Sequence, residues 1–238
     1  MSVGVVVALA VGGTVLLGAG LTWMVLHFNR QFHAEEAGVL GRLREASPRQ
    51  GWMFAERDDS VAELYTWQQQ ECWQRNPFRS LLRPPRASRA KNVITGFRRG
   101  RPFVAAQLDV HYDGEFQRVQ WIAVTTPAAR PTLSVTRSGP IASMVNNALW
   151  GEVRVGYPEF DARFDVMSPD PRFAMAALSP ALAEFLLRDP RILRGFTLLA
   201  DRIDVFDATT DHREPGQLVA ALDLRCEILD RIPAAAWA

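Results

Sequence analysis

The chain is poor in cysteine, and its two cysteines are not spaced for a disulfide framework or a metal site. Cys72 and Cys226 lie far apart among the 238 residues, in segments that we expect to be helical. Disulfide-rich folds and structural metal sites use several ligands at short, regular spacings. We therefore expect two isolated buried thiols, and neither a metal nor another cofactor.

The sequence also lacks the common catalytic motifs. It contains no G-x-S-x-G, H-E-x-x-H, C-x-x-C, P-loop or G-x-G-x-x-G pattern, which are the usual marks of nucleophile, metal and phosphate sites. His111 is expected on the polar face of a strand and His212 in an exposed loop. Five acidic residues have no EF-hand spacing and are expected at a solvated sheet edge: Asp201, Asp204, Asp207, Asp211 and Glu214. We predict no catalytic residue, and the protein is more easily explained as a non-enzyme.

Charged residues are absent from the 25 positions between Ser2 and Leu26. As a helix this segment would reach about 37 Å, more than the roughly 30 Å of bilayer hydrocarbon. A secretory signal peptide would need a basic start, a shorter apolar core and a small-residue cleavage site, none of which is present. We predict a single transmembrane helix over residues 1–28.

The orientation of this helix follows from the arginines beside it. None precedes it, whereas Arg30, Arg42, Arg44 and Arg49 follow it, and Lys and Arg favour the cytoplasmic side. We expect an inner-membrane protein with its soluble domain in the cytoplasm.

Small residues recur along the predicted transmembrane helix. Gly4, Ala8 and Gly12 are four positions apart, and a second row of small residues includes Gly18. Such rows allow two helices to approach closely and predict a homodimer in the membrane, although glycine is common in membrane helices in any case.

Acidic residues are absent from residues 75–101, which hold nine basic residues: Arg75, Arg79, Arg83, Arg86, Arg89, Lys91, Arg98, Arg99 and Arg101. Three prolines and the apolar Phe78, Leu81 and Leu82 accompany them, so we expect a basic loop. It is either a solvated loop or a segment that contacts anionic inner-leaflet lipids. The proposed lipid contacts are Arg75, Phe78, Arg79, Leu81, Leu82, Arg83, Arg86, Arg89 and Lys91. Nucleic acid is an unlikely partner, because the loop lacks the aromatic residues interleaved with basic ones that single-strand binders use, and no helix-turn-helix or finger pattern accompanies it.

The remaining sequence predicts an amphipathic stalk over residues 29–50 and one α+β domain over 51–238. Asp113-Gly114 between alternating apolar residues indicates a hairpin of an antiparallel β-meander. We expect strands at 52–55, 93–98, 103–112, 117–126 and 132–136, a strand that holds Phe160, Phe164 and Val166, and a final hairpin of 195–200 and 203–206. Helices are expected from Asp58–Ser60 to about Trp73, then at 141–149, 173–178, 180–188 and 215–232.

One motif resembles a known family. Glu159, Phe160, Phe164 and Val166, followed by Asp170, Ala174, Leu178 and Pro180, resemble the E-F-x-x-x-F-x-V, D, A, L-x-P core of a bacterial family of membrane-anchored domains of unknown function. The resemblance covers roughly residues 95–205. It implies a transmembrane segment followed by an α+β domain, and it supplies no catalytic or ligand residues.

These features favour a membrane-anchored, non-enzymatic binding or scaffold domain with an unidentified protein partner. One alternative is a membrane-tethered sensor whose pocket would be lined by Trp52, Phe54, Trp67, Trp73, Trp121 and Trp150; the other is an enzyme with an unrecognised site. Core packing is the simpler use of those rings.

Overall fold

The computed structural model describes residues 21–28, 30, 37–74, 84–137, 153–189, 191, 194–205, 209 and 211–238. The chain forms two units, Met1–Arg44 and Glu45–Ala238. Residues 21–28 are helical, as are residues 37–49, where we predicted a stalk helix. Within the described part of the chain, no helix is long and apolar enough to cross a membrane. Most of the predicted transmembrane helix, with Gly4, Ala8, Gly12 and Gly18, lies outside the described residues.

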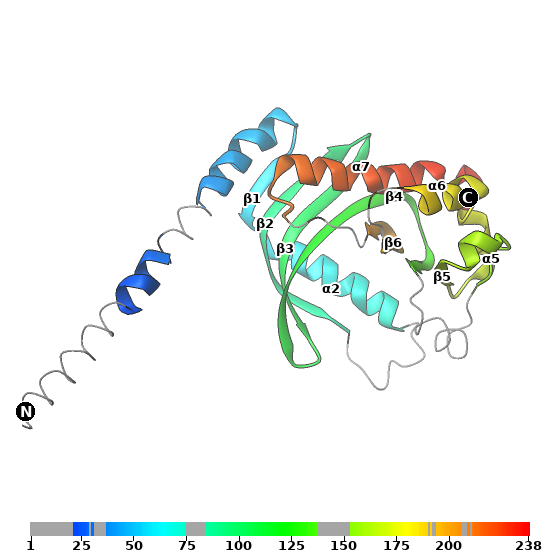
Figure 1. The fold of residues 1–238 in the computed structure, drawn as a ribbon, viewed down its shortest axis with the longest axis horizontal. Helices are drawn as coiled ribbons and strands as arrows, with labels where there is room; N and C mark the ends of the chain where they lie inside the picture. The colour runs from blue at the N-terminus through cyan, green and yellow to red at the C-terminus, as the bar shows by residue number, and fades with distance from the viewer. Residues whose placement is uncertain are drawn as a thin grey trace, which may run out of the picture. The chain divides into compact units, whose positions relative to one another are not determined.

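The larger unit is an α+β domain with an antiparallel sheet (Figure 1). Its described strands are β1 (Met53–Arg57), β2 (Arg86–Arg98), β3 (Arg101–Tyr112), β4 (Glu115–Arg137), β5 (Phe164–Met167) and β6 (Gly195–Val205). Strands β1 to β5 are neighbours in chain order, and β6 pairs with β4. The predicted meander is therefore confirmed for β2, β3 and β4.

Helix α2 (Asp59–Gln74) packs on one face of this sheet. Its start is the predicted one, because the Asp58 carboxylate accepts the Ser60 backbone N–H at 3.1 Å and caps the first turn. Val61, Ala62 and Tyr65 then pack with buried strand residues: Ala90, Val93, Val104, Ala106, Leu108, Val110, Trp121 and Ala123. The alternation of apolar residues along β3 thus faces α2.

Helix α7 (Pro215–Arg231) lies on the other face of the sheet (Figure 1). It follows the predicted bounds closely. Its buried Leu218, Leu222, Cys226 and Leu229 form the apolar stripe expected from helical spacing.

Two local features of the sheet follow from the sequence, a tight hairpin turn and an irregularity within a strand. The β3–β4 hairpin turns at Asp113 and Gly114, whose φ angles are 49° and 82°, as the Asp-Gly pair predicted. Strand β4 joins the two strands that we predicted separately. Its register with β6 shifts on both sides of Arg130, next to Pro127 and Pro131, which have no N–H to donate.

The last third of the domain departs from the prediction at two places. Phe160 is not in a strand but in the short helix α4 (Pro158–Asp161), because Pro158 favours the first turn of a helix. The predicted final hairpin is instead the single strand β6. Ala200, with a φ of 54°, marks an irregularity opposite Arg130 and not a turn. The predicted helix at 141–149 lies outside the described residues.

The resembling motif has a structural role in this part of the domain. Phe160 and Phe164 stack at 4.9 Å between ring centroids. Asp170 caps α5 (Pro171–Ala177) and Ser179 caps α6 (Pro180–Arg188), each by accepting backbone N–H groups. The 3-10 helix η1 (Ala234–Trp237) ends the chain.

Candidate functional site on the open face of the sheet

The predicted basic loop is partly wrong, because residues 86–98 form strand β2. Register shifts between Ala87 and Arg89 and between Lys91 and Ile94 break the period-two alternation that would have revealed the strand. Six of the proposed lipid-contact residues lie outside the described residues: Arg75, Phe78, Arg79, Leu81, Leu82 and Arg83. The other three, Arg86, Arg89 and Lys91, lie on β2.

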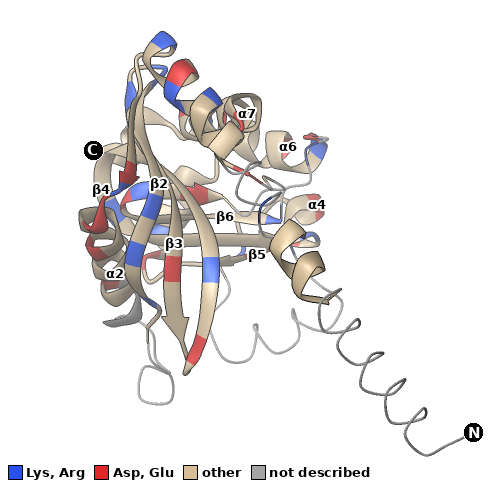
Figure 2. Cartoon of the chain, turned by 90° about the vertical axis from the view of Figure 1, so that its left-hand side faces the viewer, with Lys and Arg blue, Asp and Glu red and all other residues tan. Residues whose placement is uncertain are grey.

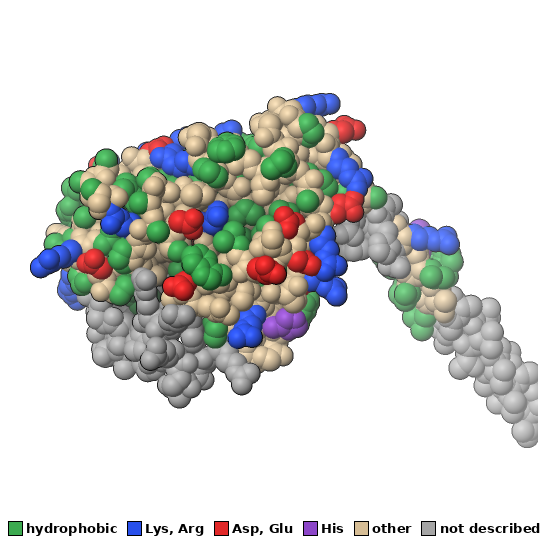
Figure 3. All heavy atoms as spheres, turned by 180° about the vertical axis from the view of Figure 1, so that it is seen from behind, with side chains coloured by type: hydrophobic (Ala, Val, Ile, Leu, Met, Phe, Trp, Pro, Cys, Tyr) green, Lys and Arg blue, Asp and Glu red, His purple; other side chains and the backbone are tan. Residues whose placement is uncertain are grey.

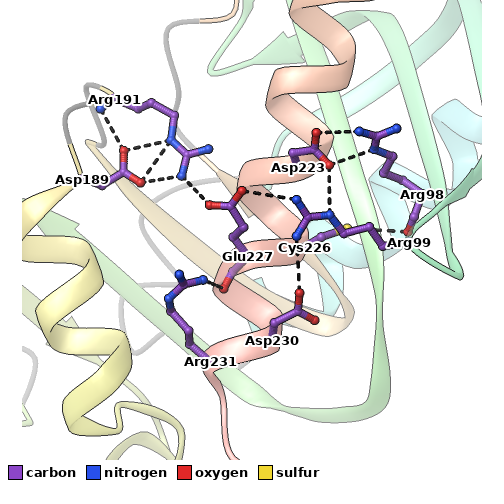
Figure 4. Close-up of polar contacts among 9 residues, drawn as sticks. All are labelled: Arg98, Arg99, Asp189, Arg191, Asp223, Cys226, Glu227, Asp230 and Arg231. Carbon is purple, nitrogen blue, oxygen red and sulfur yellow. Dashed lines mark hydrogen bonds and ion pairs between the residues drawn. The ribbon is translucent and has the colours of Figure 1, made fainter.

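The basic residues of the β2–β3 turn have countercharges, contrary to the sequence expectation. Figure 4 shows how Arg98 and Arg99 reach acidic side chains of α7. Arg98 donates two hydrogen bonds to Asp223, at 2.8 and 2.6 Å, and Arg99 Nε lies 3.1 Å from the same carboxylate. Arg101 pairs with Asp230 at 2.8 Å. These acidic partners are distant in sequence, so a charge count within residues 75–101 missed them.

This ion-pair network continues to the end of α6. Arg191 donates to Glu227 of α7 at 2.7 Å and also binds Asp189. The hydrogen bond from Arg98 holds the pKa of Asp223 below its usual range, and Arg191 does the same for Asp189. The network therefore ties the β2–β3 turn and the end of α6 to α7, which is a structural role.

Cys226 lies beside this network as a buried thiol. It is buried and free, as predicted, and its Sγ lies 3.6 Å from the Arg98 carbonyl oxygen. Burial raises the pKa of its thiol, so the reactive thiolate is disfavoured. The side chain of Cys72 lies outside the described residues.

The other basic residues of β2 share one sheet face with a basic residue of β4. Arg86 lies opposite His111, Arg89 opposite Asp109, and Asp109 opposite Arg118. Residues directly opposite in a sheet point to the same side. We call this surface the open face: Arg86, Arg89, Lys91, Gln107, Asp109, His111, Phe116, Arg118 and Gln120. Figure 2 shows it, with basic residues on both sides of one acidic residue on β3.

Asp109 is the one carboxylate of the open face. It is 6% exposed, and its oxygens lie 3.8 Å from Lys91 Nζ and 3.6 Å from Arg118 Nε. Its Oδ1 accepts no hydrogen bond from the residues that the structure describes. Four cations against one carboxylate leave the open face with a net charge of +3.

His212 borders the open face and is buried, which corrects the exposed loop position expected from the sequence. Its backbone N–H donates to Gln120 Oε1 at 2.8 Å, and its Nε2 lies 2.9 Å from the Asn92 carbonyl oxygen. Asn92 sits at the second β2 irregularity with a φ of 51°. Burial lowers the pKa of His212, partly offset by the Asn92 carbonyl and by Asp211. No sequence motif marks this contact, because it joins three distant segments.

Among the aromatic residues proposed as a sensor pocket, the described Trp52, Trp67 and Trp121 have separate neighbours. Trp52 packs edge-on against Phe103, and Trp121 against Tyr65. Trp67 is half-exposed and lines a shallow hollow of about 280 Å³ with Glu71, Arg130, Pro131, Thr132, Leu199 and other residues of α2, β4 and β6. Trp150 and the side chain of Trp73 lie outside the described residues.

Metal-binding clusters of three or more His, Cys, Asp or Glu side chains are absent from the described residues. Asp211 of the acidic series is paired with Arg213 at 2.9 Å, and Asp201 accepts from Gln68 at 3.5 Å. On the side seen in Figure 3, basic and acidic side chains are intermixed. On the open face, by contrast, four basic side chains accompany one carboxylate.

Comparisons with protein-family models and with curated proteins find no match. One similar solved structure is the mycobacterial trehalose monomycolate transport factor A, TtfA, with a TM-score of 0.49 and 14% sequence identity. The likeness covers 82% of this chain and 97% of that chain. At this score and identity it carries no function over to this protein, and the family resemblance remains an expectation.

Proposed function

We propose that this chain is a single-pass inner-membrane protein whose cytoplasmic α+β domain is a non-enzymatic binding or scaffold domain. The observation that carries the proposal is the uncharged stretch from Ser2 to Leu26, which precedes a folded domain with a basic open face. A bilayer accepts such a stretch as a helix, and the following arginines favour the cytoplasm.

The chemistry of the described side chains supports binding over catalysis. His212 is buried and hydrogen-bonded, Cys226 is a buried thiol, and the acidic residues of α7 bind arginines. These groups hold the domain together. The open face, by contrast, presents charge to its surroundings.

A membrane-tethered small-ligand sensor is the second candidate function. It is favoured by the hollow beside Trp67, where β4 is irregular and Ala200 has a positive φ. Irregular strands often adjoin binding sites. The chain can be titrated with small aromatic or zwitterionic probes while its tryptophan fluorescence is measured. Saturable quenching of Trp67 would support this candidate.

A topology experiment tests the proposed function. Green fluorescent protein fused after Ala238 should fluoresce and alkaline phosphatase fused there should be inactive, whereas fusions before Met1 should give the reverse result. The full chain should also stay in the membrane pellet after alkaline carbonate extraction. Active phosphatase after Ala238, or a chain released by carbonate, would contradict the proposal.

A further inference from the structure

We infer that the open face docks on the anionic headgroups of the bilayer to which the chain is tethered. This inference rests on the proposed function and names the partner of the domain. Its contacts are Arg86, Arg89, Lys91 and Arg118, which lie on two strands of one sheet face.

The charge of the open face fits an anionic surface. Arg86, Arg89 and Arg118 are exposed and Lys91 is 41% exposed, whereas Asp109 beneath them is buried. Arg57, which lies opposite Lys91, is paired with Asp59 and adds no net charge. A lipid phosphate at this surface would therefore contact the hydrogen-bond donors of the basic side chains, with little repulsion from a carboxylate.

The contrast with the β2–β3 turn strengthens this assignment. Arg98, Arg99 and Arg101 belong to the same basic segment of the sequence as the β2 residues of the open face. In the structure, however, α7 supplies carboxylate partners to these three arginines. On the open face the carboxylate beside the cations is Asp109, and nearby Asp59, whose charge Arg89 also feels, is bound to Arg57. The basic character of the open face thus remains available to a partner.

The aromatic content of the open face favours lipid over nucleic acid. Phe116 is 55% exposed and has His111 edge-on at 5.5 Å. One ring beside the hairpin tip is suited to the headgroup boundary, whereas single-stranded nucleic acid is bound by several rings that stack on successive bases.

Because the chain is tethered to the bilayer, weak contacts between the open face and lipid headgroups are enough to dock the domain. Fewer than thirty residues separate Leu26 from Met53 at the start of β1. A short linker holds a domain at an effective concentration in the millimolar range near its target. Each cation near an anionic leaflet raises the partition coefficient of the domain onto that leaflet about fivefold. Four cations together should therefore hold the tethered domain on the anionic surface.

The test uses the full chain with a specific protease site inserted between Arg30 and Gly38. The chain is reconstituted in vesicles of neutral phosphatidylcholine or of phosphatidylcholine with phosphatidylglycerol, and then cleaved. The freed domain should leave neutral vesicles, stay on anionic vesicles at low salt, and leave them at high salt, because salt screens surface charge.

A charge variant and a matched control identify the surface. Changing Arg86, Arg89, Lys91 and Arg118 together to Gln should lower retention on anionic vesicles more than about a hundredfold. Changing four basic residues outside the open face to Gln should leave retention within about fivefold: Arg154, Arg163, Arg172 and Arg188. If the fourfold variant fails to fold, the double variant Arg86→Gln with Arg118→Gln should lower retention about twenty-five-fold.

The outcomes separate this inference from the proposed function. A full chain that carbonate removes from both vesicle types before cleavage would contradict the membrane anchor. A chain that is anchored but is released equally from both vesicle types would overturn the inference alone. Equal losses in the open-face variant and the control variant would also overturn it. Single-stranded DNA and free anionic vesicles can each be added as competitors to release the bound domain. If DNA released the domain at a lower phosphate concentration than the competing lipid, the open face would be assigned to nucleic acid.

Discussion

At the scale of single residues, His212 makes the stability of the domain depend on pH. His212 Nε2 lies 2.9 Å from the Asn92 carbonyl oxygen and Nδ1 lies 3.3 Å from Gln120 Oε1; the shorter contact, to a group that can only accept, places the proton of the neutral ring on Nε2. Burial lowers the pKa of the folded-state imidazole, whereas in the unfolded chain it titrates near 6.5. Below about pH 6.5 the unfolded state therefore binds the proton first, and the free energy of unfolding should fall from pH 7.5 to pH 5.

The variant His212→Leu should lose about 1–3 kcal/mol at pH 7.5, because leucine has no donor for the buried Asn92 carbonyl oxygen. Its free energy of unfolding should change less with pH than that of the wild type. Urea unfolding of the detergent-solubilised chain, followed by tryptophan fluorescence, measures both effects. His111→Leu, on the exposed open face, is the control and should stay within about 0.5 kcal/mol of the wild-type stability at pH 7.5. A wild-type curve that is flat from pH 7.5 to pH 5 would disprove the linkage.

Arg225 shows why some residues resist prediction. It lies on the buried side of α7 and is 2% exposed, although arginine is almost never fully buried without partners. Its guanidinium donates to the carbonyl oxygens of Ile122, Ala221 and Val205 at 2.8, 2.9 and 3.1 Å. Leu218 and Leu222 reveal the apolar stripe of α7 in the sequence. Two of the three carbonyl acceptors, Ile122 and Val205, come from strands β4 and β6, and sequence spacing cannot show them.

At the scale of elements, the β3–β4 hairpin depends on glycine at one position. Gly114 has a φ of 82°, where a Cβ atom is strained whatever space surrounds it. Gly114→Ala should lower the free energy of unfolding by about 1 kcal/mol. Gly216→Ala, near the start of α7, is the matched control. It meets no atom within 4 Å and has no positive φ, so it should be neutral or raise stability by about 0.4–1 kcal/mol. Thermal unfolding followed by circular dichroism compares the two, and equal changes would refute the argument.

Elements with regular patterns were predicted well, and irregular strands were not. Helices α6 and α7 and the β3–β4 hairpin follow from caps, helical spacing and the Asp-Gly turn. For strand β2 we predicted only residues 93–98, because two register shifts move its basic residues onto one face and hide the alternation of a strand. Strand β6 was divided in two because Ala200 takes a turn-like φ inside a strand. The open face was missed for the same reason, since its residues come together only through the register of β2, β3 and β4.

At the scale of the whole molecule, our proposal is that the predicted tether and the open face act together. The sequence alone suggests the anchor, the α+β domain and an excess of basic residues, but it places that excess in a loop. The structure divides the basic residues between α7-bound arginines and the open face. A domain held by one helix gains further affinity for the same surface from each added contact, and a dimer of the chain would present two open faces.

We therefore also expect the predicted transmembrane helix to dimerise in the membrane. If residues 1–28 form a transmembrane helix, Gly4, Ala8 and Gly12 lie along one side of it, with Gly18 in an adjoining row, so two backbones can approach closely. Gly12→Leu and Gly18→Leu should each weaken dimerisation severalfold in a membrane two-hybrid assay, because a large side chain separates the helices. At about 3.6 residues per turn, Gly13 falls on the opposite side of the helix, so Gly13→Leu adds the same bulk without touching the rows. If all three variants dimerise as the wild type does, the small residues reflect only the composition of membrane helices, and the domain binds its surface as a monomer.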